Sequence, residues 1–427
     1  MRYRIQADTV ITVDDAFHIF QPGQVTWDGH VIVSVGPPEL DTSRVDQEIN
    51  VSGGIVMPGF YNGHNHAAMT LLRGLADDSP FFEWLEQHIW PREARLTSDD
   101  IYVGTLLAAI EMIKSGTVAF ADMYFEMEAV ARATEESGMR GWLSRGLVGN
   151  DDLDFVKLNQ SVEFVDAWRG KAEGRIVPML GPHAPYTCSP AYLARVGQVA
   201  KDLGVGIHIH LAESPTEVQQ MQQQYGLSPI GVAWQAGLFE SRLLIAHGVH
   251  IQPEDLGYLT GMTGGIISCP ISNAKLGNGI MPYSLLSAQS VPVGLGTDGA
   301  ASTNSLDMFL EMKAMAWMQK LVEGRPEAFN ARTALTMATR RTAEILGSAG
   351  GVLEPGRPAD LIVVDATAAA MTPEIDPVAN VVYTATGSNV LYTVVNGEIL
   401  LADGLLTRLD ERAIIQEAKQ RLQHLFA

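Results

Sequence analysis

The sequence predicts an α/β protein in which a (β/α)8 TIM-type barrel is joined to a small β-sandwich. Eight short apolar runs alternate with longer amphipathic stretches in the middle of the chain, and the two chain ends are rich in β-branched residues. Eight buried strands that alternate with helices over about 300 residues are typical of a (β/α)8 barrel with insertions. Polar ionisable residues end several of the apolar runs, as they do around a barrel's active site.

Both ends of the chain predict strands and hairpins. Asp28-Gly29 separates two β-branched runs near the start, and Asn396-Gly397 separates two near the end. A last helix is expected over residues 410–426, where apolar residues recur at helical spacing. Because the two ends have the same character, we expect residues 1–57 and 357–427 to form one composite β-sandwich domain. Residues 58–356 are then the barrel domain.

The middle of the chain supplies the eight predicted barrel strands and the helices between them. One helix is expected to start at Thr97-Ser98-Asp99-Asp100, which offers N-cap side chains, and to end before Gly116. Another is expected over residues 305–321. The strand candidates are GGIVMPGFYNGH, TVAFADMY, RGWLSRGLV, RIVPMLGPH, VGIHIHLAE, RLLIAHGVH, GGIISCPIS and VPVGLGTDG.

Composition excludes several classes of function. The 427 residues carry a net charge of −20, and such an acidic surface repels the phosphates of nucleic acids. No apolar stretch is long enough for a membrane span, and the N-terminus alternates like a strand, so we expect a cytoplasmic protein. Cys188 and Cys269 are too few for a disulfide scaffold or a multi-cysteine zinc site.

The ends of the predicted strands carry the residues of a metal site. His64 and His66 end the first run and share one side of a strand, so together they can hold one ion. His210 and Asp298 can complete the set, because strand ends converge on one face of a barrel. Three histidines and a carboxylate suit zinc or a similar divalent ion. His208 shares the side of His210 but lies farther from the barrel mouth, so His210 is favoured as the ligand.

The chain resembles the metal-dependent amidohydrolase superfamily and, within it, the 5′-methylthioadenosine/S-adenosylhomocysteine deaminase family, which is related to triazine hydrolases. The resemblance covers essentially the whole chain. The matching segments are MPGFYNGHNHAAMTLLRGLADD, GPHAPY, IHLAES, IAHGVH, KLGNGI and LGTDGAAS.

The resemblance implies that His64, His66, His210 and Asp298 are the metal ligands, in agreement with the strand-end argument. The ion expected is a single Zn²⁺, with Fe²⁺ or Mn²⁺ as alternatives. Superfamily members with two metals bridge them by a carboxylated lysine at the end of strand four, and RIVPMLGPH contains no lysine. A bound divalent ion makes water nucleophilic near neutral pH.

The resemblance also assigns catalytic roles. Glu213, three residues after His210, is expected to carry the water's proton to a ring nitrogen. His247 is expected to orient the attacking water, and Asp298 to accept a proton on its way to the leaving ammonia. His183 is similar to a histidine that hydrogen-bonds the base. A structural alternative for Glu213 is a carboxylate that caps the following helix.

Two further residues are expected to bind substrate. Glu93 aligns with a glutamate that holds ribose hydroxyls, and Arg145 with a substrate-binding arginine. Relatives that handle S-adenosylhomocysteine well have another arginine about a dozen residues after Arg145 in the family pattern. Here DDLDFVKLNQ has none, and Lys157 is not a matched replacement. The preferred substrate is therefore expected to be 5′-methylthioadenosine or adenosine.

The alternative functions that share this scaffold and metal site are those of a triazine amino- or chlorohydrolase, a guanine deaminase and a pterin deaminase. An inactive assembly scaffold would not need a complete ligand set with Glu213. The cysteine-ligated zinc deaminases require H-x-E and P-C-x-x-C motifs, which this sequence does not contain. Because members of this superfamily often self-associate, a dimer or tetramer is expected. The loop of residues 75–91 is expected to shape the pocket.

Overall fold

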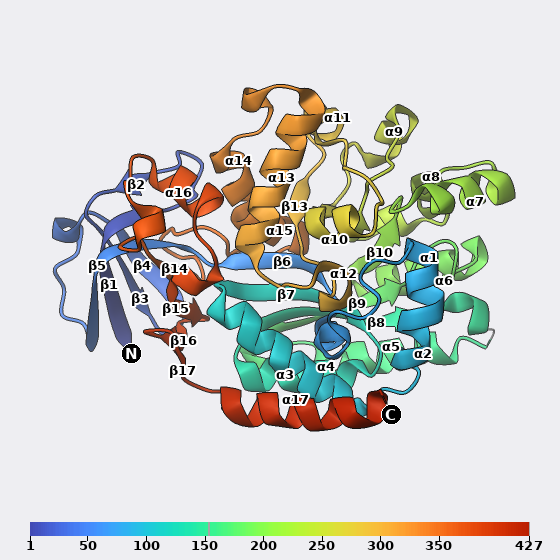
Figure 1. Cartoon of the computed structure of the whole chain (residues 1–427), viewed down its shortest axis with the longest axis horizontal. Coiled ribbons are helices and arrows are strands. Elements are labelled where there is room, and N and C mark those ends of the chain that lie inside the picture. Colours follow the sequence, from blue (N-terminus) through green and yellow to red (C-terminus); the bar gives the residue numbers. More distant parts are fainter. Residues whose placement is uncertain (153, 427) are drawn as a thin grey trace.

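The computed structural model describes residues 1–152 and 154–426, and it consists of a helix-covered barrel beside a twisted sheet (Figure 1). Leu153 and Ala427, which fall within the predicted barrel and sandwich ranges, lie outside the described residues. The boundaries of the two predicted domains stay a prediction.

Eight parallel strands form the barrel and confirm the predicted fold class. Each strand pairs with its neighbours in chain order, so the sheet runs from β6 to β13. Almost every residue of these strands is buried, which explains why they read as continuous apolar runs. The strands are β6 (Phe60–Asn65), β7 (Thr117–Tyr124), β8 (Arg140–Leu147), β9 (Ile176–Pro182), β10 (Ile207–Leu211), β11 (Leu243–His247), β12 (Gly264–Ser268) and β13 (Val293–Leu295).

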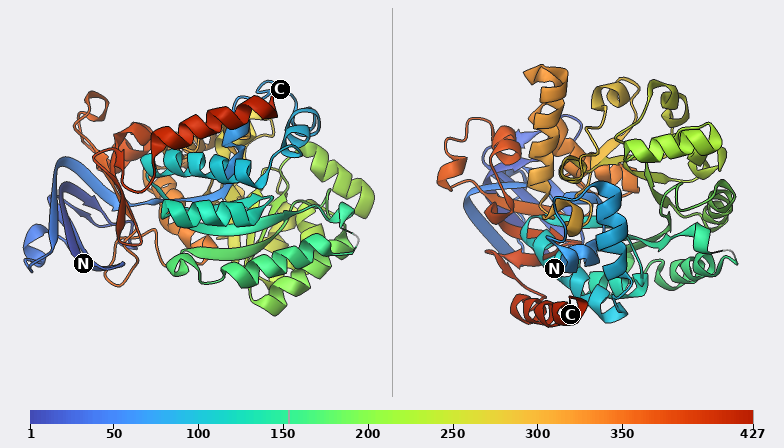
Figure 2. Two further views of the ribbon diagram at one scale, coloured as in Figure 1. Left: turned by 90° about the horizontal axis from the view of Figure 1, so that it is seen from below. Right: turned by 45° about the vertical axis from the view of Figure 1, so that its right-hand side comes forward.

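Helices surround the barrel and cover its outer face (Figure 2). The expected helix after Thr97 is present as α3 (Ser98–Lys114), and the one expected over 305–321 is present as α13 (Met308–Glu323). The α-helices between β7 and β14 are α4 (Met127–Ser137), α5 (Val156–Trp168), α6 (Pro190–Leu203), α7 (Pro215–Tyr225), α8 (Pro229–Gln235), α9 (Leu256–Leu259), α10 (Pro270–Lys275), α11 (Tyr283–Ala288), α12 (Ala300–Thr303), α13 (Met308–Glu323), α14 (Ala331–Thr336) and α15 (Thr342–Leu346).

The first and last barrel strands meet at the point where the candidate ligands lie. The amide of Asp298, just beyond β13, donates to the carbonyl of His64 on β6 at 2.9 Å. A Cβ atom at Gly296 would lie 2.6 Å from the His64 nitrogen, so this approach requires glycine. The closure of the barrel therefore brings Asp298 next to His64.

The two chain ends share one mixed nine-stranded sheet. The Asp28-Gly29 turn joins β3 to β4, and the Asn396-Gly397 turn joins β15 to β16, as predicted. The Trp27 indole donates to the Gly397 carbonyl at 3.0 Å, which ties the two ends together. The strands are β1 (Arg2–Ile11), β2 (Ile19–Phe20), β3 (Gly23–Asp28), β4 (Val31–Gly36), β5 (Gln47–Pro58), β14 (Leu361–Asp365), β15 (Val390–Val395), β16 (Glu398–Ala402) and β17 (Leu405–Leu406).

The first apolar run differs from its prediction as a single barrel strand. It divides at Gly59 into β5, which belongs to the outer sheet, and β6, which belongs to the barrel. A Cβ atom at Gly59 would lie 2.1 Å from the Val118 side chain on β7, so the crossing backbone passes where no side chain fits. The chain thus passes from the outer sheet to the barrel directly before β6, the strand that leads to the predicted ligands His64 and His66.

The last helix, α17 (Glu411–Leu425), leaves the outer sheet and lies along α3 (Ser98–Lys114) of the barrel (Figure 1). Lys114 pairs with Glu411 at 2.9 Å, and Arg421 pairs with the buried Asp100 at 3.2 Å. Asp100 also closes a capping box with Thr97 at the start of α3. Among the helices of residues 1–152 and 154–426, none is long and apolar enough to cross a membrane.

Candidate active site

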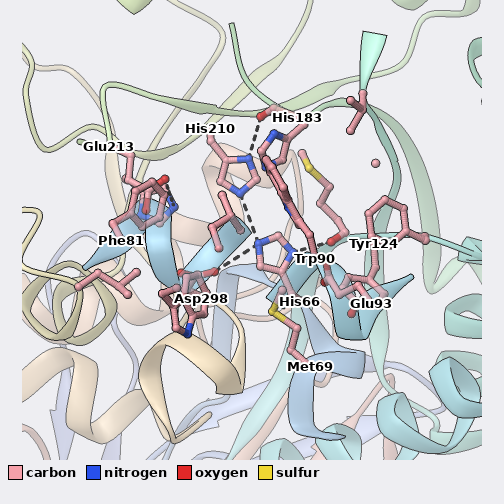
Figure 3. Close-up of a pocket in the computed structure, with 18 of the residues that line it drawn as sticks. His66, Met69, Phe81, Trp90, Glu93, Tyr124, His183, His210, Glu213 and Asp298 are labelled. Carbon is pink, nitrogen blue, oxygen red and sulfur yellow. Dashed lines mark hydrogen bonds and ion pairs between the residues drawn. The ribbon is translucent and has the colours of Figure 1, made fainter. Parts of the chain in front are cut away.

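A cavity opens at the carboxyl ends of the barrel strands and contains most of the predicted site residues (Figure 3). One side of the cavity carries ionisable groups that come from different strands, and the rest is largely aromatic and apolar. The predicted residues that line it are His66, Glu93, His183, His210, Glu213, His247 and Asp298. The fully buried His64 lies directly behind them.

The Nε2 atoms of His64 and His66 converge on Asp298, and His210 lies beside them. The Oδ1 atom of Asp298 lies 3.3 Å from Nε2 of His64 and 3.3 Å from Nε2 of His66. Nε2 of His210 lies 3.3 Å from Nε2 of His66. Ligand atoms of His64, His210 and His247 also lie within 4.8 Å of one another. The four predicted ligands are therefore brought together around one point, with His247 beside them.

Three of these imidazole rings are held by hydrogen bonds at Nδ1. His66 meets the Met123 carbonyl at 2.5 Å, and His210 meets the His183 carbonyl at 2.8 Å. Nδ1 of His247 lies 3.0 Å from the Asn273 side-chain oxygen. Because a carbonyl oxygen can only accept, Nδ1 carries the proton in each ring. Nε2 then has a free lone pair directed at the cluster.

His64 acquires the same tautomer through a longer chain of contacts. The Ser144 hydroxyl donates to the Asp122 carbonyl at 2.9 Å, so its oxygen accepts from Nδ1 of His208 at 3.3 Å. Nε2 of His208 is then the acceptor for Nδ1 of His64 at 2.8 Å. His208, the alternative ligand, therefore lies behind His64 and fixes which of its nitrogens faces the cluster.

The carboxylate of Asp298 is divided between two tasks. Oδ2 accepts from the hydroxyls of Ser272 and Ser302, each at 2.7 Å. Oδ1 accepts from the Gly299 amide at 2.8 Å and faces the histidines. Burial alone would raise the pKa of Asp298, but the imidazoles beside it, His64 first among them, hold that pKa well below its ordinary value. Asp298 is thus an anion at neutral pH.

This donor set fits one divalent ion. Burial lowers the pKa of His64 to about 3 and lowers those of His66 and His210, so the rings are neutral, as ligands must be. Nε2 of His64 is buried and has no hydrogen-bond partner among the described residues. Imidazole nitrogens with one carboxylate oxygen are the donors that catalytic zinc sites use.

Glu213 lies at the same end of the cavity, just after β10. Its Oε1 accepts from the Asn278 side-chain amide at 3.0 Å, and its Oε2 lies 3.8 Å from Nε2 of His247. The Asn278 carbonyl in turn accepts from His250 at 2.7 Å. Burial and the negative charge of Asp298 raise the pKa of Glu213 well above its ordinary value. A carboxyl group of this kind can hold a proton and pass it on near neutral pH.

The far end of the cavity contains a second polar group. One carboxylate oxygen of Glu93 and the hydroxyl of Tyr124 are buried without a hydrogen-bond partner among the described residues, and both residues line the cavity. Burial raises the pKa of Glu93 to about 7, although the neighbouring Tyr124 hydroxyl acts in the opposite direction. These atoms are available to a ligand's hydroxyl groups.

Arg145 is not among the described residues that line this cavity. Arg145 lies on β8, and its guanidinium is 3.6 Å from the carboxylate of Glu126 and 3.5 Å from that of Glu128. Lys157 likewise lies outside the cavity lining, at the start of α5. The predicted substrate contact of Arg145 stays a prediction.

Sequence reasoning missed the residues that hold the site residues in place. Asn278 belongs to KLGNGI and Ser302 to GTDGAAS, two motifs that carried the resemblance without being given a task. Ser272 and Asn273 are adjacent on α10. The Ser272 hydroxyl donates to Asp298, and the Asn273 side-chain oxygen accepts from His247. A serine or asparagine just beyond a predicted strand was the available signal, but its partner could not be identified without the fold.

Comparison with known families gives one match over most of the chain. Residues 55–400 match the amidohydrolase family. A 5-methylthioadenosine/S-adenosylhomocysteine deaminase of Pelotomaculum thermopropionicum is 45% identical over 99% of this chain and 98% of its own length. A 5′-deoxyadenosine deaminase of Methanosarcina mazei is 43% identical over 98% of this chain and 97% of its own length.

Solved structures agree with this match. An adenosine deaminase from Xanthomonas campestris with bound zinc superposes with a TM-score of 0.94, at 31% identity and with 99% of this chain and 98% of that chain covered. Atrazine chlorohydrolase from Arthrobacter aurescens, complexed with zinc, shares the fold at a TM-score of 0.92 and 24% identity, over 98% of this chain and 100% of its own.

Proposed function

Since the chain belongs to the amidohydrolase family, we propose that it is a metal-dependent hydrolase that removes the 6-amino group of adenine nucleosides as ammonia. One observation carries the proposal. A single cavity joins the histidine and aspartate cluster, the Glu213 carboxyl and the unpaired oxygen of Glu93. The named relatives act on adenine nucleosides, and an adenosine deaminase shares the fold.

We propose one divalent ion, zinc, held by His64, His66, His210 and Asp298. When bound, it supplies the Lewis acid that makes a water molecule nucleophilic near neutral pH. Glu213 takes a proton from the water that attacks C6 and delivers it to N1 of the purine ring. His247 orients that water, and Asp298 accepts the second proton, which leaves with the amino group as ammonia. The products are ammonia and the inosine analogue.

The remaining lining supports a finer statement about the substrate. Outside the metal end, the cavity is apolar and aromatic, and Glu93 is its one charged group among the described residues. The lining there includes Met69, Phe81, Trp84, Leu85, Trp90, Met123, Tyr124, Phe125, Val148 and Tyr186. We propose that Glu93 holds ribose hydroxyls, that His183 contacts the base and that the 5′ substituent is small and uncharged, as in 5′-methylthioadenosine. A dimer or tetramer and a cytoplasmic location stay predictions.

An ammonia-release screen of the zinc-loaded protein tests the proposal. We expect release from 5′-methylthioadenosine and adenosine. S-adenosylhomocysteine should have a kcat/KM lower by about tenfold or more, because its carboxylate would be desolvated in a lining with no described cation. Guanine, pterins and hydroxylated triazines are the comparison compounds. Release from these alone would overturn the proposed function, and equal kcat/KM for S-adenosylhomocysteine would overturn the finer statement.

A further inference from the structure

A second buried glutamate lies behind Glu213 and has no task in the proposed reaction. Glu217, in the first turn of α7, is 1% exposed. Its Oε1 accepts from the Ala212 amide at 3.1 Å, and its Oε2 accepts from the Glu213 amide at 2.8 Å. Both carboxylate oxygens are therefore bound to the backbone segment that presents the Glu213 side chain.

The N-terminus of α7 does not need the side chain of Glu217 as a cap. Ser214 is the N-cap residue, and its hydroxyl already accepts from the Glu217 amide at 3.2 Å. In a capping box the third residue of the helix would return a bond to the N-cap amide. Glu217 instead reaches past Ser214 to the two preceding amides. The geometry is that of a clamp on Ala212 and Glu213 rather than an ordinary helix cap.

The clamped segment has a backbone conformation that needs support. Ala212 has a φ of 54°, in the left-handed region that residues with a Cβ atom seldom adopt. Its carbonyl also accepts from the His250 amide at 2.8 Å. The reversal at Ala212 turns the chain out of β10, so that Glu213 follows at the cavity, 3.0 Å from Asn278. Loss of the clamp would release this reversal.

We propose that Glu217 is a positioning residue for the proton-transfer step: it fixes the backbone at Ala212 and Glu213 and so places the Glu213 carboxyl at the reacting atoms. The proposal rests on the proposed function, because it concerns the reaction assigned to the same site. Displacement of a reacting group by as little as about 1 Å can cost a hundredfold in rate. Removal of the clamp should therefore affect kcat and leave metal and substrate binding nearly unchanged.

Glu217→Gln is the sharpest variant, because glutamine keeps the size of the side chain. Its one remaining oxygen can accept from one amide, while its NH₂ group would face the other amide as a second donor. We expect kcat to fall by about tenfold or more, with KM and metal content retained. In a Glu213→Gln background, the same change should alter kcat by less than about twofold, because the group it positions is already absent.

Ser214→Ala is the matched control. It removes the helix cap and lowers stability by about 1 kcal/mol, but it leaves the bonds to Ala212 and Glu213 in place, so kcat should stay near the unaltered value. A kcat for E217Q within twofold of the unaltered protein would overturn the proposal. So would an equal loss in the Glu213→Gln background, or a comparable loss in S214A.

Crystal structures of the zinc-loaded protein and of E217Q give a result that does not depend on turnover. We expect the Glu213 carboxyl to leave its 3.0 Å contact with Asn278 in the variant. An unchanged contact would contradict the positioning proposal even if no nucleoside were deaminated. Absence of deamination by the unaltered protein, with a displaced Glu213 in the variant, would instead reject the proposed function alone.

Discussion

The imidazole of His208 illustrates how a single residue outside the predicted ligand set governs the site. Strand alternation places His208 and His210 on one side of β10, and the sequence alone could not assign them different tasks. The distinction comes from neighbours on other strands: His208 contacts His64 on β6 and Ser144 on β8, whereas His210 reaches the cluster. Such partners depend on the barrel's closure and are invisible in the local pattern.

Replacing His208 by Phe should weaken zinc binding. Phe keeps a ring in the buried space but cannot accept from Nδ1 of His64, so that ligand loses its fixed orientation. Loss of such a partner typically raises the metal dissociation constant about 10- to 100-fold, which competition with a chelator can measure. Ser144→Ala, one contact farther away, should have a smaller effect. Zinc affinity equal to that of the unaltered protein would show that His208 does not orient His64.

At the scale of elements, periodicity and turn chemistry predicted the barrel strands, both hairpins and α3 with N-cap side chains among residues 97–100; the structure makes Thr97 the N-cap. They did not predict that one apolar run would divide between two sheets at Gly59, because residues 54–58 at the end of β5 are buried like all of β6 and no polar residue marks the change. The segment over the cavity was expected only as a loop. It forms α1 (Phe81–Glu83), a π-helical turn at Trp84–Ile89 and α2 (Trp90–Glu93).

That segment explains why Glu93 could be placed only by resemblance. A π-helical turn shifts the residues that follow it relative to an α-helix, so helical spacing does not indicate where Glu93 points. In the structure Glu93 and Trp90 lie at the cavity (Figure 3), and Trp84 of the same segment also lines it. The barrel residues, by contrast, could be predicted because strand ends always converge on one face.

At the scale of the whole molecule, buried ionisable groups make stability depend on pH. Burial lowers the pKa of His64 to about 3 and that of His183 to about 4. As pH falls through 6.5, these two histidines bind protons in the unfolded chain but not in the folded one, so the free energy of unfolding decreases in acid. Burial raises the pKa of Glu93 and Asp122 to about 7 and of Glu217 to about 8. For these carboxyls the folded state binds the extra proton, so stability falls as pH rises toward those values.

The melting temperature of the metal-free protein should therefore decrease between pH 7 and pH 8, because the folded state loses the protons of the carboxyls there, whereas the unfolded histidines have already lost most of theirs. Each carboxyl contributes at most about 1.4 kcal/mol per pH unit to this slope. Calorimetry across the interval measures the trend, and Glu93→Gln should make it shallower because glutamine does not titrate. A melting temperature that rises over the interval would contradict the buried state of these groups.

The central claim is that one ion and the Glu213 carboxyl act together on an adenine nucleoside. Titration of zinc into the metal-free protein, with ammonia release from 5′-methylthioadenosine as the signal, tests it most directly. Activity should reach its plateau at about one ion per chain, the stoichiometry of a catalytic site with an open coordination position. Glu213→Gln should bind the same ion while its turnover falls by about 10²-fold or more. Undiminished turnover by that variant, or activity independent of added metal, would contradict the claim.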